Sequence, residues 1–71
     1  MDRDDLIKRI HRTEDCIQQG QRRIHAQQIK IHRMELRGEE TKFAIERLEE
    51  LQSTQQRYEQ NWHSLLDALR K

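Results

Sequence analysis

The sequence has little of what usually stabilises a small protein. Its 71 residues include no proline, one cysteine, two glycines and three aromatic residues. The single cysteine, Cys16, excludes an intrachain disulfide and favours a reducing compartment. The longest apolar runs, such as 43–45, are far shorter than the ~20 residues that a helix needs to cross a bilayer. Because the charged N-terminus also lacks the features of a secretory signal, we expect a cytoplasmic protein with no membrane partner.

Apolar residues are scarce as well. Hydrophobic residues make up 32% of the chain and charged residues 38%, which is close to the composition of disordered chains. A folded chain of this length buries only about 60% of the surface that its unfolded form exposes. Proteins of this size therefore usually need a disulfide, a metal or oligomerisation. Since no disulfide is possible, we expect the chain to associate with a second copy.

The apolar residues of the first half follow the seven-residue repeat of a coiled coil. Isoleucine forms one column, here called a, and its companion column, d, is mixed. Column a holds Ile10, Ile17, Ile24 and Ile31, and column d holds Leu6, Thr13, Gly20, Gln27 and Met34. An apolar column with this period over four repeats predicts a long helix with one apolar stripe.

The second half has a stripe of its own, with spacings of four and three residues in alternation. The stripe consists of Ala44, Leu48, Leu51, Gln55, Tyr58, Trp62, Leu65 and Leu69. Further large apolar residues lie beside the two stripes, namely Ile7, Ile29, Leu36, Phe43, Ile45 and Leu66. A stripe wider than columns a and d suits helices that touch more than one neighbour. We therefore expect two hairpins to pair into a homodimeric four-helix bundle.

Gly38 separates the two stripes. Glycine adopts, without steric cost, the left-handed conformation that ends a helix. The acidic residues after Gly38 are favourable at a helix N-terminus, where the helix dipole is positive. Either Glu40 or Thr41 is a candidate cap for the second helix. The whole chain, 1–71, is expected to form one domain, with a helix over about 3–37, a turn at 38–39 and a second helix over about 40–69.

A two-residue turn forces the helices antiparallel, so the expected fold class is all-α, an antiparallel two-helix hairpin resembling a coiled coil. The level pairs expected from a turn at Gly38 are Ile31 with Leu48, Ile24 with Gln55, Ile17 with Trp62, and Ile10 with Leu69. In this register Gly20 makes room for the ring of Tyr58. Gln27 and Gln55 lie within about a turn of each other and would fix the register as a polar pair.

The chain also resembles a group of short helical-hairpin proteins from rhizobia and related α-proteobacteria. The resemblance is carried by Gly20, Gln21, Arg22, Arg23, Ile24, Gln27, Ile31, Met34, Gly38, Thr41, Ala44 and Leu48. It spans about residues 6–69, and it differs at Met34, where those proteins usually have leucine. The resemblance implies a helical hairpin and implies no activity.

A basic segment in the first helix is the best candidate for contact with nucleic acid. Its members are Arg22, Arg23, Lys30, Arg33 and Arg37. The segment 16–34 carries a charge of +4 and the segment 39–59 a charge of −3, and no aromatic residues are interleaved with the bases. We therefore expect salt bridges between the helices, or between subunits, to occupy these bases rather than nucleic acid.

Metal-binding and catalytic arrangements are weak in the sequence. His11, His25 and His32 share one column, but seven residues span about 10.5 Å along a helix, too far for two histidines to share a metal. Cys16 and His63 would approach each other in the expected register, and Glu59 is the only clear further ligand. A hairpin offers no pocket or oxyanion donors, so we expect no catalytic residues, no metal and no cofactor.

These observations predict a small structural or protein-interaction hairpin that self-associates, with no enzymatic activity and no small-molecule substrate. Another protein is a further possible partner. The alternative is a nucleic-acid-associated regulator that uses the basic face of the first helix. The residues expected to form the seam and interface are Ile10, Ile17, Ile24, Ile31, Leu48, Leu51, Tyr58, Trp62, Leu65 and Leu69.

Overall fold

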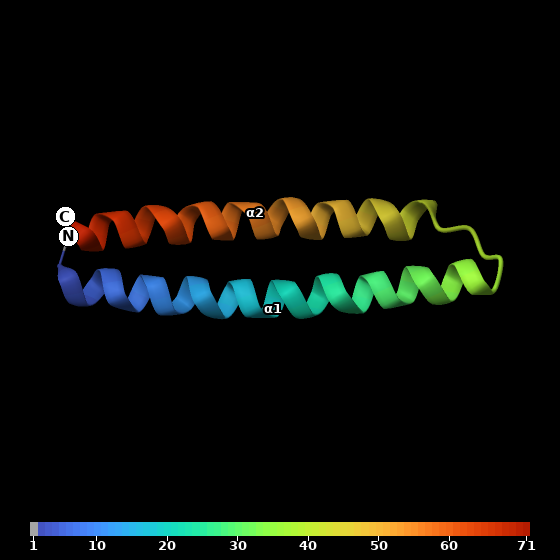
Figure 1. Ribbon diagram of the computed structural model, residues 1–71, viewed down its shortest axis with the longest axis horizontal. Coiled ribbons are helices and arrows are strands. Elements are labelled where there is room, and N and C mark those ends of the chain that lie inside the picture. Colours follow the sequence, from blue (N-terminus) through green and yellow to red (C-terminus); the bar gives the residue numbers. More distant parts are fainter. Residues whose placement is uncertain (1) are drawn as a thin grey trace.

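The computed structural model describes residues 2–71 and consists of two long helices, α1 (Arg3–Leu36) and α2 (Lys42–Arg70). The helices run antiparallel and side by side, so both termini lie at one end and the connection lies at the other (Figure 1). The Cα atoms fill a rod of 53 × 14 × 13 Å. The expected all-α, antiparallel two-helix hairpin is therefore confirmed.

The ends of α1 agree with the local sequence. Asp2 is the N-cap, and its carboxylate accepts a hydrogen bond from the backbone N–H of Asp4 at 3.4 Å. Acidic residues in the first turn and Arg33 in the last turn complement the partial charges of the helix termini. With no proline in the chain, nothing in the sequence interrupts the 34 residues between these ends.

Gly38 ends α1 in the left-handed conformation, with φ of 71°. The N–H of Gly38 donates to the carbonyl oxygen of Glu35 at 3.0 Å, and the N–H of Glu39 donates to that of Met34 at 2.9 Å. This pair of bonds is the Schellman motif, which satisfies carbonyl groups that the end of a helix leaves without partners. The role predicted for Gly38 is thus the one that the backbone shows.

The connection is longer than expected. Five residues, 37–41, lie between the helices, and α2 begins at Lys42 rather than near residue 40. Thr41 is the N-cap residue, but its side chain makes no capping hydrogen bond. As Figure 1 shows, α1 extends past the start of α2, and the connection runs back along the molecule to reach it. Leu36, at this projecting end, is 75% exposed.

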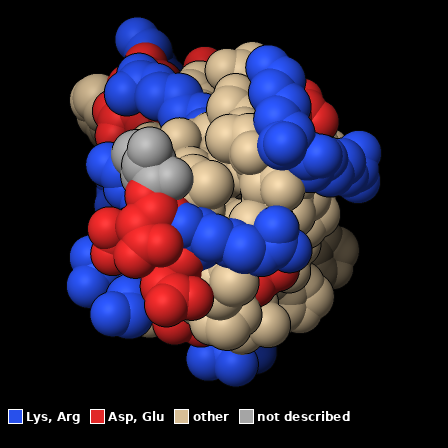
Figure 2. Space-filling view, turned by 90° about the vertical axis from the view of Figure 1, so that its left-hand side faces the viewer, with Lys and Arg blue, Asp and Glu red and all other residues tan. Residues whose placement is uncertain are grey.

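The best-packed part of the hairpin lies near the termini. Leu6, Ile10 and Leu65 form a buried cluster, against which pack the partly buried residues Trp62, Leu66 and Leu69. Seen from this end, uncharged residues extend from the middle of the molecule to one side, and acidic side chains gather mainly on the other (Figure 2). Elsewhere Ile31 and Ala44 are the buried hydrophobic residues, and no described side chain is less than 2% exposed. One hairpin therefore forms only a thin core.

The predicted register is wrong by about one helical turn. Gln55 was expected level with Ile24, but it lies against Gly20 and bonds to the backbone of Ile17. Trp62, expected level with Ile17, reaches one turn further to Glu14. Because the apolar stripes recur every three or four residues, a shift of one turn leaves apolar residues facing each other. The hydrophobic pattern alone could not distinguish the two registers.

Candidate interaction surfaces

A buried glutamine occupies the centre of the seam. Gln55 is 6% exposed, and its amide nitrogen donates to the carbonyl oxygen of Ile17 at 2.8 Å. The side chain fits because Gly20 has no Cβ; a Cβ built there would overlap the Gln55 Oε1 atom. Gly20 was expected to accommodate Tyr58, so the expectation of a close approach holds but the partner is different. The Gln55 Oε1 atom has no hydrogen-bond partner among residues 2–71.

A second glutamine bridges the helices nearer the turn. The Gln27 amide nitrogen donates to the carbonyl oxygen of Ala44 at 2.9 Å. Each glutamine thus bonds to the backbone of the opposite helix, and the expected pairing of Gln27 with Gln55 is wrong. Ten residues of α1, roughly 15 Å, separate Gln27 from the Gln55 acceptor on Ile17. The two bonds fix the register independently at two levels.

The predicted seam residues all lie between the helices or at their edge, but few are fully buried. The buried members are Ile10, Ile31 and Leu65. The half-buried members are Ile17, Ile24, Leu48, Leu51, Tyr58, Trp62 and Leu69. A two-helix pair covers only one side of each stripe, so the flanks of these side chains stay in contact with solvent.

One long side of the hairpin, here the Trp62 face, carries an open groove of about 870 Å³. The lining residues are His11, Glu14, Asp15, Ile17, Gln18, Gln21, Glu59, Trp62 and His63. The indole N–H of Trp62 donates to Glu14 Oε2 at 3.2 Å, and its ring meets that of His63 edge to face at 5.0 Å. Trp62 is therefore half-buried with its polar atom satisfied, and its ring forms part of an accessible surface.

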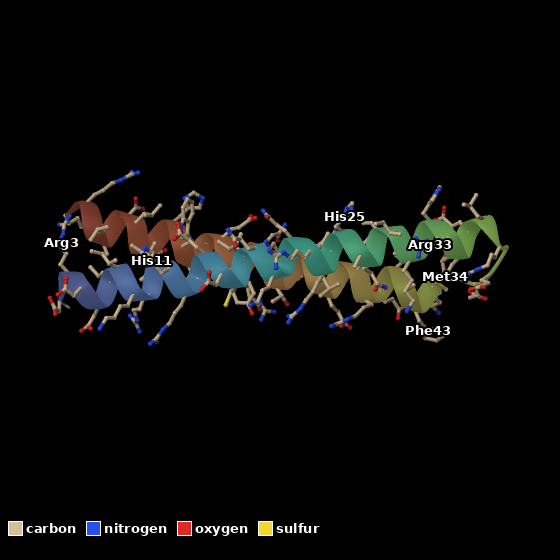
Figure 3. The ribbon with its side chains drawn as sticks, turned by 90° about the horizontal axis from the view of Figure 1, so that it is seen from below. Arg3, His11, His25, Arg33, Met34 and Phe43 are labelled. Atoms are coloured by element: carbon tan, nitrogen blue, oxygen red, sulfur yellow. The ribbon has the colours of Figure 1, made fainter. Side chains whose placement is uncertain are left out.

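The opposite long side, here the Arg47 face, is basic with an apolar floor. Two adjoining grooves share Gln27, Lys30 and Arg47. Their remaining lining residues are Arg23, Ala26, Leu51, Met34, Glu40, Phe43 and Ala44. Figure 3 shows His25 at one edge of the hairpin and Phe43 at the other. Arg47, from α2, lies beside the predicted bases Arg23 and Lys30. This meeting of bases from the two helices depends on the register and could not be predicted from residue types.

All five predicted basic residues, four in α1 and Arg37 just after it, are exposed, but the expected salt bridges to α2 are not formed. Arg37 pairs with Glu39 at 2.9 Å, two residues away, while Arg22, Arg23, Lys30 and Arg33 have no acidic partner within residues 2–71. The acids of α2 explain this. Glu46, Glu49 and Glu50 line a shallow depression formed by α2 residues alone, so they point away from α1.

Exposed apolar side chains concentrate toward the turn. Phe43 is 77% exposed and Leu36 is 75% exposed, whereas Ile29 and Ile45 are each 39% exposed. These four residues were expected to lie outside the seam and to be available to a neighbour. The structure places them on several sides of the hairpin, because Ile45 and Phe43 fall on opposite flanks of the α2 stripe. A single neighbour cannot cover all of them.

The candidate metal ligands do not assemble. Among residues 2–71, no three or more His, Cys, Asp or Glu side chains are arranged to hold a metal ion. His63 lines the Trp62 groove with His11, and Cys16 is a half-buried free thiol that is not part of that lining. The approach of Cys16 to His63 depended on the register that the structure corrects.

Neither α1 nor α2 is both long and apolar enough to cross a membrane within the described residues. The chain was also compared with protein-family models, with curated proteins and with solved structures, and none of them matches it. The surfaces described above are therefore the basis for assigning a function.

Proposed function

We propose that this chain is a small protein-interaction hairpin that self-associates into a homodimeric four-helix bundle. The observation that carries the proposal is the incomplete burial of the stripes, since seven of the ten predicted seam residues are only half-buried. Contact with a second hairpin would remove these flanks from water, which stabilises by about 25 cal/mol per Å² of apolar surface. No catalytic step is part of this role, and the single thiol suits a cytoplasmic location.

The dimensions of the hairpin suit such a dimer. One long face, 53 Å by 14 Å between Cα extremes, projects onto roughly 700 Å², close to the ~800 Å² that each partner of a standard interface buries. The projecting side chains increase this area further. A full-length contact between two hairpins is therefore large enough for a stable dimer.

Sedimentation equilibrium and light scattering over a concentration series test this proposal, with far-ultraviolet circular dichroism measured on the same samples. We expect a dimer that dissociates on dilution, with helicity falling in parallel because the dimer supplies part of the core. A folded, helical monomer at the highest concentrations would contradict the proposal. So would an unfolded monomer at those concentrations.

One observation favours a second candidate function, association with nucleic acid. Arg22, Arg23, Lys30 and Arg33 are exposed without an acidic partner in the described chain, and Arg47 adds a fifth cation from α2. Fluorescence anisotropy with random DNA and RNA at several salt concentrations tests it. Binding that weakens steeply with salt would support this role, and no binding at 50 mM salt would remove it.

A further inference from the structure

The two long faces of the hairpin differ in their suitability for a second copy. On the Trp62 face, two columns of residues flank the seam. The α1 column is Ile7, Glu14, Gln21, Gln28 and Glu35, and the α2 column is Ile45, Gln52, Glu59 and Leu66. Glu14, Gln21 and Glu59 line the groove, and residues seven apart share their side of the helix. The face is thus polar in the middle and apolar at both ends.

The Arg47 face would repel another copy of itself. It presents Arg23, Lys30 and Arg47, and the acids near them are Glu40 at the groove end and Glu50, which pairs with Arg47 at 3.2 Å. A two-fold interface places the same patch on both sides, so the cations of one copy would be brought close to those of the other. Arg23 and Lys30 have no acidic partner within residues 2–71, and burying them beside further cations is costly.

We infer that the second copy covers the Trp62 face and lies antiparallel to the first; this rests on the proposed self-association. The terminal end of the face carries Ile7 and Leu66, and the turn end carries Ile45. In an antiparallel pair, Leu66 of one copy lies over Ile45 of the other, because the two residues are about equally far from the middle of α2. Both apolar ends are then covered.

The polar residues on this face favour the same orientation. Glu14 and His25 are equally far from the middle of α1. An antiparallel pair therefore brings the Glu14 carboxylate toward the ring of His25 of the second copy, whose N–H can donate a hydrogen bond. A parallel pair would instead bring Glu14 to the same level as Glu59 of the second copy, where the two carboxylates repel.

A matched pair of substitutions tests which face is covered. Ile45→Glu and Phe43→Glu make the same change in charge two residues apart in α2, on opposite faces of the hairpin. We expect Ile45→Glu to raise the dimer Kd by about tenfold or more, because it buries a carboxylate between the copies. Phe43→Glu should change Kd by less than about twofold, because Phe43 stays exposed in the dimer. The reverse result would overturn the inference.

Single cysteines test the orientation, in a Cys16→Ser background. Gln56 is at the middle of α2, in the same column as His63 on the Trp62 face, and Thr54 shares the column of Arg47 on the other face. An antiparallel dimer on the Trp62 face brings the two copies of residue 56, one from each chain, close together. Their Cα atoms then lie within the ~7 Å that a disulfide spans. We expect mild oxidation to crosslink Gln56→Cys and to leave Thr54→Cys monomeric on a denaturing gel.

The outcomes separate this inference from the proposed function. If the unmodified chain is monomeric by sedimentation, both the self-association and its interface are wrong. If it is a dimer but Phe43→Glu dissociates it, or Thr54→Cys crosslinks in place of Gln56→Cys, self-association stands and the assigned face is wrong. A dimer that Ile45→Glu dissociates but Gln56→Cys fails to crosslink would contradict the antiparallel orientation alone. Circular dichroism of each variant establishes that the helices are retained.

Discussion

At the end that carries the termini, Leu6, Ile10 and Leu65 form a buried cluster supported by Trp62 and other partly buried side chains. At the turn end, by contrast, Ile31 and Ala44 lie outside that cluster, and Phe43 is 77% exposed. The same two stripes run through both ends. Between them the seam is polar, with Gln55 against Gly20.

The difference follows from the residues beside the isoleucine column. Near the termini, the α2 residues in and around the cluster of Ile10 are the large Trp62, Leu65 and Leu69. Near the turn, the facing position on α2 is the small Ala44, and α1 projects beyond the start of α2. A regular heptad pattern therefore fixes which side of a helix is apolar, while the size of the facing residues decides how well each level packs.

The comparison is tested most strongly by truncating one isoleucine at each end. We expect Ile10→Ala to lower the free energy of unfolding by about 3 kcal/mol and Ile31→Ala by about 2 kcal/mol, because more apolar atoms surround Ile10. Urea denaturation at one fixed protein concentration measures both, since association contributes to stability. Equal losses would mean that the two ends are equally well packed in solution.

Replacing the turn glycine should have a smaller effect, confined to the turn end. Gly38 has φ of 71°, and nothing lies within 4 Å of a Cβ built there, so the cost of Gly38→Ala comes from the backbone alone. We expect a loss of about 1 kcal/mol, the usual cost of a left-handed residue with a side chain. Asparagine tolerates this conformation better, so Gly38→Asn should lose less and serves as the control.

Replacing the buried glutamine at the centre of the seam should raise the free energy of unfolding rather than lower it. Gln55→Leu removes a buried oxygen that has no partner in the described chain, and it retains a side chain of similar size. We expect the free energy of unfolding to rise by up to about 1 kcal/mol, because replacing a poorly satisfied polar group by an apolar one is near neutral or stabilising. Thermal denaturation monitored at 222 nm measures it. A clear loss of stability would show that the bond to Ile17 outweighs the unpaired oxygen.

Gly20→Ala should have the smallest effect, although the new Cβ collides with the Gln55 amide. The amide is the far end of a flexible side chain and can turn away, which loses its bond to Ile17 at about 1 kcal/mol. Alanine in a helix returns about 1 kcal/mol relative to glycine. We expect a net change within about 0.5 kcal/mol. In the Gln55→Leu background the same substitution should be less favourable, because the leucine side chain fills the space that the new Cβ needs.

Several features could be read directly from residue types and spacing. The isoleucine column predicts α1, the alternating stripe predicts α2, and Gly38 predicts the end of the first helix. These are local or periodic signals that depend on backbone conformation and on which side of a helix is apolar. The start of α2 was placed about two residues too early, because neither Glu40 nor Thr41 supplies a side-chain cap that would mark it.

The register, and every contact that depends on it, could not be read in the same way. Stripes with a three-to-four residue repeat match equally well after a shift of one turn, so the sequence could not pair Gln55 with Gly20 or Trp62 with Glu14. The positions of the charged side chains could not be predicted from the sequence either. Opposite net charges on the two segments suggested salt bridges, but Glu46 and Glu49 lie on the outer side of α2.

The amino-acid sequence by itself determined two helices, their apolar sides and the glycine between them, because each of these depends on residues close together in the chain. Only the tertiary structure decided how far one helix slides along the other, which polar side chains enter the seam, and that Arg23, Lys30 and Arg47 share one long face. Those features depend on side-chain size and hydrogen bonding across the hairpin, between residues as much as 48 positions apart.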